Sequence, residues 1–145
     1  MLMTGESLSK AEAKLMNPVV LAFVGDAVYS LYVRNRMAVC YKGKPADFQR
    51  TAGKVVSAHS QSAFVEQISP LFTEEETEIF LRGRNAKKGA KSKNADVAEY
   101  NRSTGFEAVL GFLYVSGQTA RIEELLSYAP EEFFTPQQPM NAYKP

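Results

Sequence analysis

The apolar stretch from Val19 to Val33, VVLAFVGDAVYSLYV, strongly limits what this chain can fold into. Its first ten residues contain one polar side chain, Asp26. A carboxylate among apolar neighbours is costly unless it finds a cation, a hydrogen-bond donor or a proton. The stretch therefore predicts a core helix in which Asp26 has a specific partner.

Apolar residues recur at helical spacing along the chain, whereas the alternation typical of strands is scarce. We expect helices over residues 7–16, 17–37, 45–56, 58–68, 73–84, 103–115 and 119–128, with a loop over 85–95 and a short helical turn over 96–101. The sequence thus predicts an all-α domain of about seven helices over residues 1–130. Three prolines in the last ten residues favour a loosely ordered C-terminal tail over 131–145.

Several of these helices begin with capping signals. Asn17 followed by Pro18 is typical of a helix start, and Ser9 or Ser7 can cap the first helix. Thr73 begins a capping box with acidic residues in the first turn. We therefore assign structural rather than catalytic roles to the glutamates at 74–76.

The single cysteine and the single histidine exclude several classes of site. Cys40 alone allows neither an internal disulfide nor a thiolate zinc site, and His59 alone rules out a multi-histidine metal site. No apolar run has the length needed to span a bilayer, and the start of the chain lacks the pattern of a signal peptide. We expect a soluble, cytoplasmic protein without a membrane partner.

A second apolar segment, Ser103 to Ser116, also contains a lone carboxylate, Glu107. Small residues flank both acids and leave room for close helix packing or for an ion. Two acids in the two most apolar helices favour a metal site, and oxygen ligands favour magnesium, with manganese as an alternative, over zinc. The alternative is that each acid pairs with an arginine or a buried hydroxyl. Gly25, beside Asp26, either allows a helix or ligand to approach or only relieves crowding.

Basic residues are concentrated between Arg82 and Arg102, where the net charge is +5, while the rest of the chain carries −4. Such a segment suits the phosphates of a nucleic acid, and an RNA duplex is favoured because no run of aromatic residues offers a stacking platform. The alternative is a solvated loop. The predicted RNA-binding residues are Arg82, Arg84, Asn85, Lys87, Lys88, Lys91 and Lys93.

Two motifs resemble a known family. The segment LAFVGDAVYSLYV is similar to the signature helix of the ribonuclease III family, and STGFEAVLGFLY is similar to that family's second acidic helix. The short length, the RGRNAK segment and the lack of a following double-stranded-RNA-binding domain resemble the Mini-ribonuclease III branch. The resemblance covers most of residues 17–128.

The resemblance implies the ribonuclease III endonuclease fold, a homodimer built around the signature helix with Phe23 near the interface, and magnesium-dependent cleavage of double-stranded RNA. In this branch it implies maturation of the precursor of large-subunit (23S) ribosomal RNA, with a ribosomal protein or the assembling large subunit as a further partner. Asp26 and Glu107 take the places of the two acids that bind the metal and catalyse cleavage.

Two further acidic positions of the family are not carboxylates here. They are Ala22 and Thr104, and the Thr104 hydroxyl could support the metal or its water. The competing functions are an inactive double-stranded-RNA-binding or ribosome-associated homologue and a helical scaffold with no nucleic-acid role. The sequence assigns no role to Lys54. His59 is expected to be a surface or capping residue rather than a general base.

Overall fold

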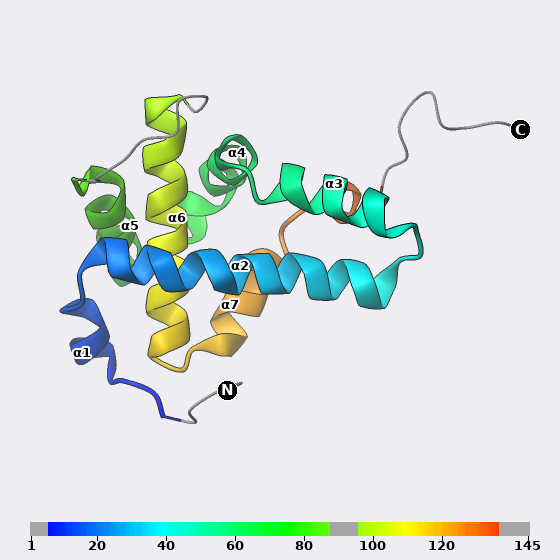
Figure 1. Ribbon diagram of the computed structural model, residues 1–145. Coiled ribbons are helices and arrows are strands. Elements are labelled where there is room, and N and C mark those ends of the chain that lie inside the picture. Colours follow the sequence, from blue (N-terminus) through cyan, green and yellow to red (C-terminus); the bar gives the residue numbers. More distant parts are fainter. Residues whose placement is uncertain (1–5, 88–95, 137–145) are drawn as a thin grey trace, which may run out of the picture.

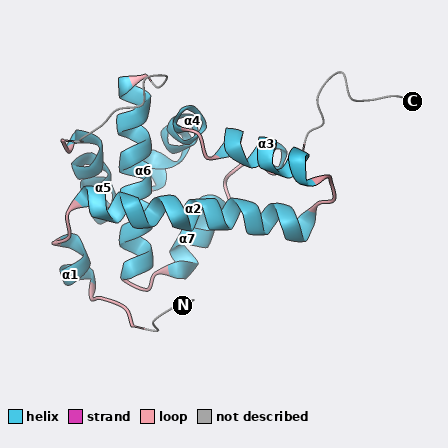
Figure 2. Ribbon diagram, viewed as in Figure 1, coloured by secondary structure: helices cyan, strands magenta, loops and turns pink. Residues whose placement is uncertain are grey.

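The computed structural model of the protein describes residues 6–87 and 96–136, and this part is all helical, without a strand (Figures 1 and 2). The prediction of an all-α fold with seven helices is confirmed. Two 3₁₀ turns follow α4 and α7, at Ser69–Leu71 and Glu131–Phe133. The helices are α1 Lys10–Lys14, α2 Pro18–Cys40, α3 Pro45–Val55, α4 Ala58–Ile68, α5 Glu74–Asn85, α6 Val97–Val115 and α7 Thr119–Leu126.

The capping signals in the sequence act as predicted. Ser9 caps α1 in a full capping box, and Asn17 accepts a hydrogen bond from the Val19 amide at the start of α2. Thr73 and Glu76 form the capping box of α5, and Glu76 also pairs with Arg121. The structural role assigned to this group of glutamates is thus confirmed for Glu76.

Helix α6 is the centre of the fold. It crosses α2 at a steep angle and packs against α4 and α5 (Figure 1). Every residue from Ser103 to Leu113 is buried except Glu107, which is half-buried. Glu107, the lone carboxylate of the second apolar segment, is therefore the position along this stretch of α6 that solvent can reach.

Two glycines allow α2 and α6 to touch backbone to backbone. A Cβ atom built on Gly25 would lie 1.7 Å from the carbonyl oxygen of Glu107, and one on Gly111 would lie 1.8 Å from that of Leu21. Gly25 therefore allows α6 to approach α2 closely, which favours this explanation of the glycine over simple relief of crowding. The crossing also places residue 26 directly beside residue 107.

The structure corrects the expected burial of Asp26. One face of α2 packs inward through residues such as Leu21, Tyr29 and Val33, but Asp26 is exposed and lies at the edge of that face. The opposite face of α2 is apolar and exposed as well, and Phe23 keeps 80% of its surface accessible. Periodicity could not separate the two faces because both are apolar.

Two predicted element boundaries were wrong. The short turn at 96–101 and the helix at 103–115 form one continuous helix, because Asp96 caps α6 and accepts a hydrogen bond from the amide of Glu99. Residues 131–136 of the predicted loose tail pack on the domain, since Phe134 is fully buried and the Arg36 guanidinium lies 4.3 Å from the centre of its ring. Residues 137–145 lie outside the described part.

None of the helices in the described ranges is both long enough and apolar enough to cross a membrane.

Candidate active site

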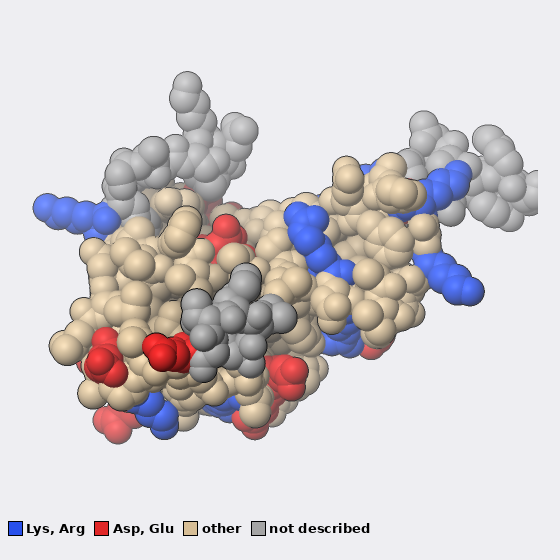
Figure 3. All heavy atoms as spheres, turned by 60° about the horizontal axis from the view of Figure 1, so that its bottom comes forward, with Lys and Arg blue, Asp and Glu red and all other residues tan. Residues whose placement is uncertain are grey.

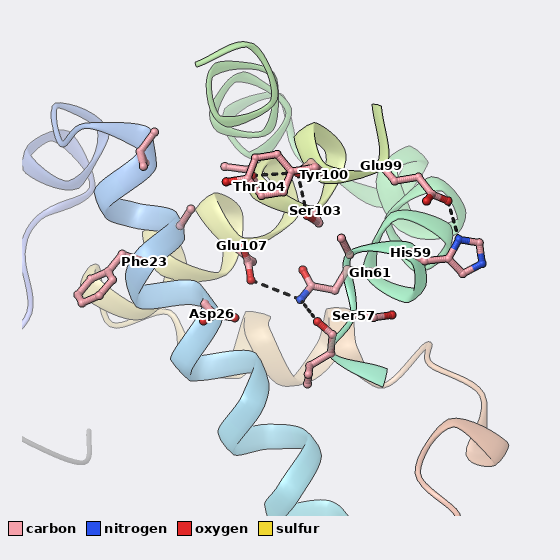
Figure 4. A pocket seen from close by; sticks show the side chains of 14 residues that line it. Phe23, Asp26, Ser57, His59, Gln61, Glu99, Tyr100, Ser103, Thr104 and Glu107 are labelled. Carbon is pink, nitrogen blue, oxygen red and sulfur yellow. Dashed lines mark hydrogen bonds and ion pairs between the residues drawn. The ribbon is translucent and has the colours of Figure 1, made fainter. Parts of the chain in front are cut away.

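A cleft of about 640 Å³ lies where α2, α4 and α6 meet (Figure 4). Both predicted acids line it, Asp26 from α2 and Glu107 from α6. The other lining residues are Val19, Ala22, Phe23, Val56, Ser57, Ala58, His59, Gln61, Glu99, Tyr100, Ser103 and Thr104. The cleft is therefore the meeting point of the two motifs that the sequence singled out.

Asp26 and Glu107 interact directly across this cleft. Burial of the Glu107 carboxyl, its hydrogen bond with Asp26 and the negative charge of Asp26 raise the pKa of Glu107 from 4.5 to about 8, against the opposing hydrogen bond from Gln61. Two carboxyl groups share a hydrogen bond only when one of them holds a proton. Near neutral pH the pair therefore holds a proton in the place that a cation could take.

Neither carboxylate has a basic partner in the described part of the chain. The ion pairs found there join other residues, and none involves Asp26 or Glu107. The alternative that each acid pairs with an arginine is therefore not supported. Acidic groups held together in a cleft are a common feature of sites that bind a cation or exchange a proton.

The donor set fits a hard divalent cation such as Mg²⁺, which needs few protein ligands because it keeps several waters. The described residues contain no cluster of three or more His, Cys, Asp or Glu side chains that could hold a metal ion. The third carboxylate that lines the cleft, Glu99, contacts His59, so Asp26 and Glu107 are the two acids that remain for an ion. Further protein oxygens must then be neutral. Magnesium or manganese fits such oxygen ligands better than zinc.

The two positions at which the family has acids both lie on the wall of the cleft. Ala22 is buried and contributes no polar atom. Thr104 is also buried, and its hydroxyl donates a hydrogen bond of 2.9 Å to the carbonyl oxygen of Tyr100. The hydroxyl oxygen retains acceptor capacity, so its predicted supporting role is compatible with this geometry.

Sequence reasoning missed Gln61. This glutamine is buried on α4, and its Nε2 donates hydrogen bonds to the Val56 carbonyl oxygen at 2.9 Å and to Glu107 Oε2 at 3.3 Å. A signal was present, because Gln61 precedes the buried residues Phe64 and Val65 at helical spacing. A polar amide at a position where that spacing predicts an apolar residue marks a specific interaction.

His59 lies at the mouth of the cleft, on α4. Its side chain is exposed, as predicted, and its Nδ1 lies 2.6 Å from Glu99 Oε2 of α6. This contact ties α4 to α6 beside the site, whereas Glu107 is not among the contacts of His59. Lys54 is exposed and lines a neighbouring cavity together with His59.

The basic segment divides into parts with different roles. Arg82 donates hydrogen bonds of 2.6 and 3.1 Å to the carbonyl oxygens of Lys14 and Met16, so it fixes the end of α1 on α5. We therefore remove Arg82 from the expected RNA contacts. Arg84 bonds to the side chain of Asn85 next to it, and Lys87 is exposed. The predicted contacts Lys88, Lys91 and Lys93 lie outside the described residues.

Phe23 belongs to an exposed apolar surface beside the cleft. Val20 and Leu31, on the same helix, are 46% and 51% exposed. On the face of the molecule drawn in Figure 3, Lys, Arg, Asp and Glu side chains are scattered among other residues. An apolar face of this kind is typical of a protein interface.

Comparisons with known proteins give a consistent result. Residues 19–118 match the family model of the Ribonuclease III domain. The chain is 42% identical over 127 residues to a Mini-ribonuclease 3 of Brevibacillus brevis, covering 88% of this chain and 94% of that protein. It is 45% identical over 116 residues to a Mini-ribonuclease 3 of Staphylococcus aureus, covering 79% and 87%. A crystal structure of a Fusobacterium nucleatum protein superposes with a TM-score of 0.70 at 25% identity, covering 78% and 90%.

Proposed function

Because this chain belongs to the ribonuclease III family, in its Mini-ribonuclease III branch, and is an endoribonuclease of that type, we propose that it cleaves double-stranded RNA with a divalent cation held at Asp26 and Glu107. The observation that carries this proposal is that both carboxyl groups line one cleft and that neither has a basic partner in the described part of the chain. Magnesium is the proposed ion, with manganese as a substitute.

The cleft supplies the means to hold the ion. Asp26 is open to solvent, and Glu107 is fixed at the helix crossing where Gly25 brings the two backbones together. Thr104 offers a further oxygen on the same wall. When bound, a divalent cation activates a water and stabilises the negative charge that develops on the phosphate.

Binding of the RNA is assigned to the basic segment that links α5 to α6. Contacts to phosphates are electrostatic, and a segment rich in lysine provides them without reading sequence. The segment leads directly into the helix that carries Glu107, so it would hold a phosphate backbone near the cleft. The proposed contacts are Arg84, Asn85, Lys87, Lys88, Lys91 and Lys93.

We further propose a homodimer formed through the exposed apolar face of α2. Phe23 belongs to this face and also lines the cleft beside Asp26. A dimer built on this face would therefore bring the two active sites close to one interface. Two such sites could each cut one strand of a single duplex.

The proposed natural substrate is the precursor of 23S ribosomal RNA in the cytoplasm of a bacterium, with a ribosomal protein or the assembling large subunit as a partner. The support is the resemblance to the Mini-ribonuclease III branch and the similarity to its bacterial members. Because this chain has no second RNA-binding module within the described residues, a partner that presents the RNA would add to the affinity of its own basic segment.

Long double-stranded RNA, incubated with magnesium and separately with EDTA, tests the proposal. The wild-type protein should cleave with magnesium alone, and Asp26→Asn and Glu107→Gln should each lose more than about 100-fold in rate while still binding RNA. Glu123→Gln, which removes an exposed carboxylate on α7, is the matched control. Absence of cleavage at every salt concentration would contradict the proposal, and binding without cleavage would favour the inactive homologue.

A further inference from the structure

Gln61 has an unusual environment for an amide side chain. It is only 2% exposed, and it reaches from α4 toward Glu107 (Figure 4). Its Nε2 donates to two acceptors, the carbonyl oxygen of Val56 at 2.9 Å and Glu107 Oε2 at 3.3 Å. Both hydrogens of the amide group therefore have partners.

These two partners fix the orientation of the amide. The Val56 carbonyl accepts hydrogen bonds and cannot donate one, so the nitrogen of Gln61 must face it and the oxygen must face elsewhere. In that orientation Oε1 is buried and has no hydrogen-bond partner among the described residues. Buried polar atoms are nearly always paired, so an unpaired one requires an explanation such as a water or an ion.

The position of this oxygen suggests what it binds. Oε1 and Nε2 share one carbon atom, so Oε1 lies within a few ångströms of the Glu107 carboxyl group. An amide oxygen is a hard, neutral ligand of the kind that magnesium and manganese accept. Ala22 and Thr104 occupy two positions at which the family has acids, so this cleft offers a cation fewer charged oxygen donors and leaves room for a neutral one.

We propose that Gln61 Oε1 is a third protein oxygen of the cation site, binding the ion or one of its waters beside Asp26 and Glu107. This inference rests on the proposed function, since it takes the ion at these two acids as given. Gln61 then has two roles. Its nitrogen orients the Glu107 carboxylate, and its oxygen compensates in part for the missing acids.

Binding of Mn²⁺, measured from the electron paramagnetic resonance signal of the free ion at pH 8.5, tests the inference without relying on activity. Gln61→Leu keeps the approximate volume and removes both polar atoms, and it should weaken Mn²⁺ binding by about 10- to 100-fold. Gln61→Glu keeps an oxygen at Oε1 and loses the two donated hydrogen bonds, and it should bind Mn²⁺ at least as tightly as the wild type. Gln67→Leu and Gln67→Glu, at an exposed position of the same helix, should stay within about twofold.

The two substitutions at position 61 separate a metal ligand from a structural hydrogen-bond donor. If Gln61→Glu binds Mn²⁺ as weakly as Gln61→Leu, the donor role explains the residue and the inference is wrong. Unchanged affinity in Gln61→Leu would also overturn it while leaving the proposed function intact. If the wild type itself binds no Mn²⁺, both proposals fail. Should Gln61→Leu lack helical circular dichroism, the comparison of Gln61→Glu with the wild type decides.

Discussion

Replacing Glu107 with glutamine should stabilise the metal-free protein. The folded protein holds a proton at Glu107 up to about pH 8, because burial and Asp26 raise the pKa of Glu107 from 4.5 to about 8. The unfolded chain loses this proton near its ordinary pKa. An acid with a raised pKa therefore lowers the free energy of unfolding as the pH rises between these two values.

The magnitude follows from the same values. Between pH 4.5 and pH 7, each pH unit costs about 1.4 kcal/mol for one proton held only by the folded state, which gives an upper limit of about 3 kcal/mol. A glutamine needs no proton, and it can donate to Asp26 and accept from Gln61. Because Asp26 is exposed and water weakens its charge, we expect a gain of about 1–3 kcal/mol at pH 7.

Urea unfolding in EDTA at pH 5 and at pH 8 measures this effect. The gain of Glu107→Gln should be under about 1 kcal/mol at pH 5, because this pH is only about half a unit above the ordinary pKa of 4.5 at which the unfolded chain loses the Glu107 proton, and it should be largest at pH 8. In a separate measurement without EDTA, saturating Mn²⁺ should raise the free energy of unfolding of the wild type more than that of Glu107→Gln. Glu123→Gln should show no such dependence on pH. A Glu107→Gln protein that is less stable than the wild type at pH 8, or a gain equal at both pH values, would refute the reasoning.

Three further predictions concern the ion, the helix crossing and the interface. Binding of Mn²⁺ must displace the proton shared by Asp26 and Glu107, so calorimetry in buffers of different ionisation enthalpy should show proton release. The affinity for Mn²⁺ should also rise with pH and level off above about pH 8. Binding without proton release would contradict the pairing of the two carboxyl groups. Gly25→Ala puts a Cβ 1.7 Å from a backbone oxygen and should abolish the native melting transition, whereas Gly53→Ala, with no atom within 4 Å, should leave it unchanged or slightly raised. Phe23→Asp should convert a dimer to a monomer in sedimentation experiments, and a monomeric wild type would contradict the proposed interface.

Local signals in the sequence predicted most of the helices correctly. Asn17 before Pro18 and the capping box at Thr73 depend on neighbouring residues, so they could be recognised without the fold. Asp26 and Glu107 stood out because each is a lone charge in an apolar helix. The crossing that brings them together was suggested by the small residues around them, but the partner of Gly25 could not be identified from periodicity.

Features that depend on distant contacts were missed. Phe134 is buried by packing against residues such as Arg36 and Tyr32, so its proline-rich surroundings gave a wrong prediction. The burial of Asp26 was overestimated because apolar composition does not show which face of a helix meets another helix. Gln61 was overlooked because its role depends on where Glu107 lies.

The position of a bound Mn²⁺ ion in crystals of the wild-type protein would show whether Asp26 and Glu107 hold the cation. Its anomalous scattering locates the ion independently of any assumption about ligands. We expect a peak in the cleft about 2.0–2.4 Å from one oxygen of Asp26 and one oxygen of Glu107. A peak held by other residues, or an empty cleft at saturating Mn²⁺, would contradict it.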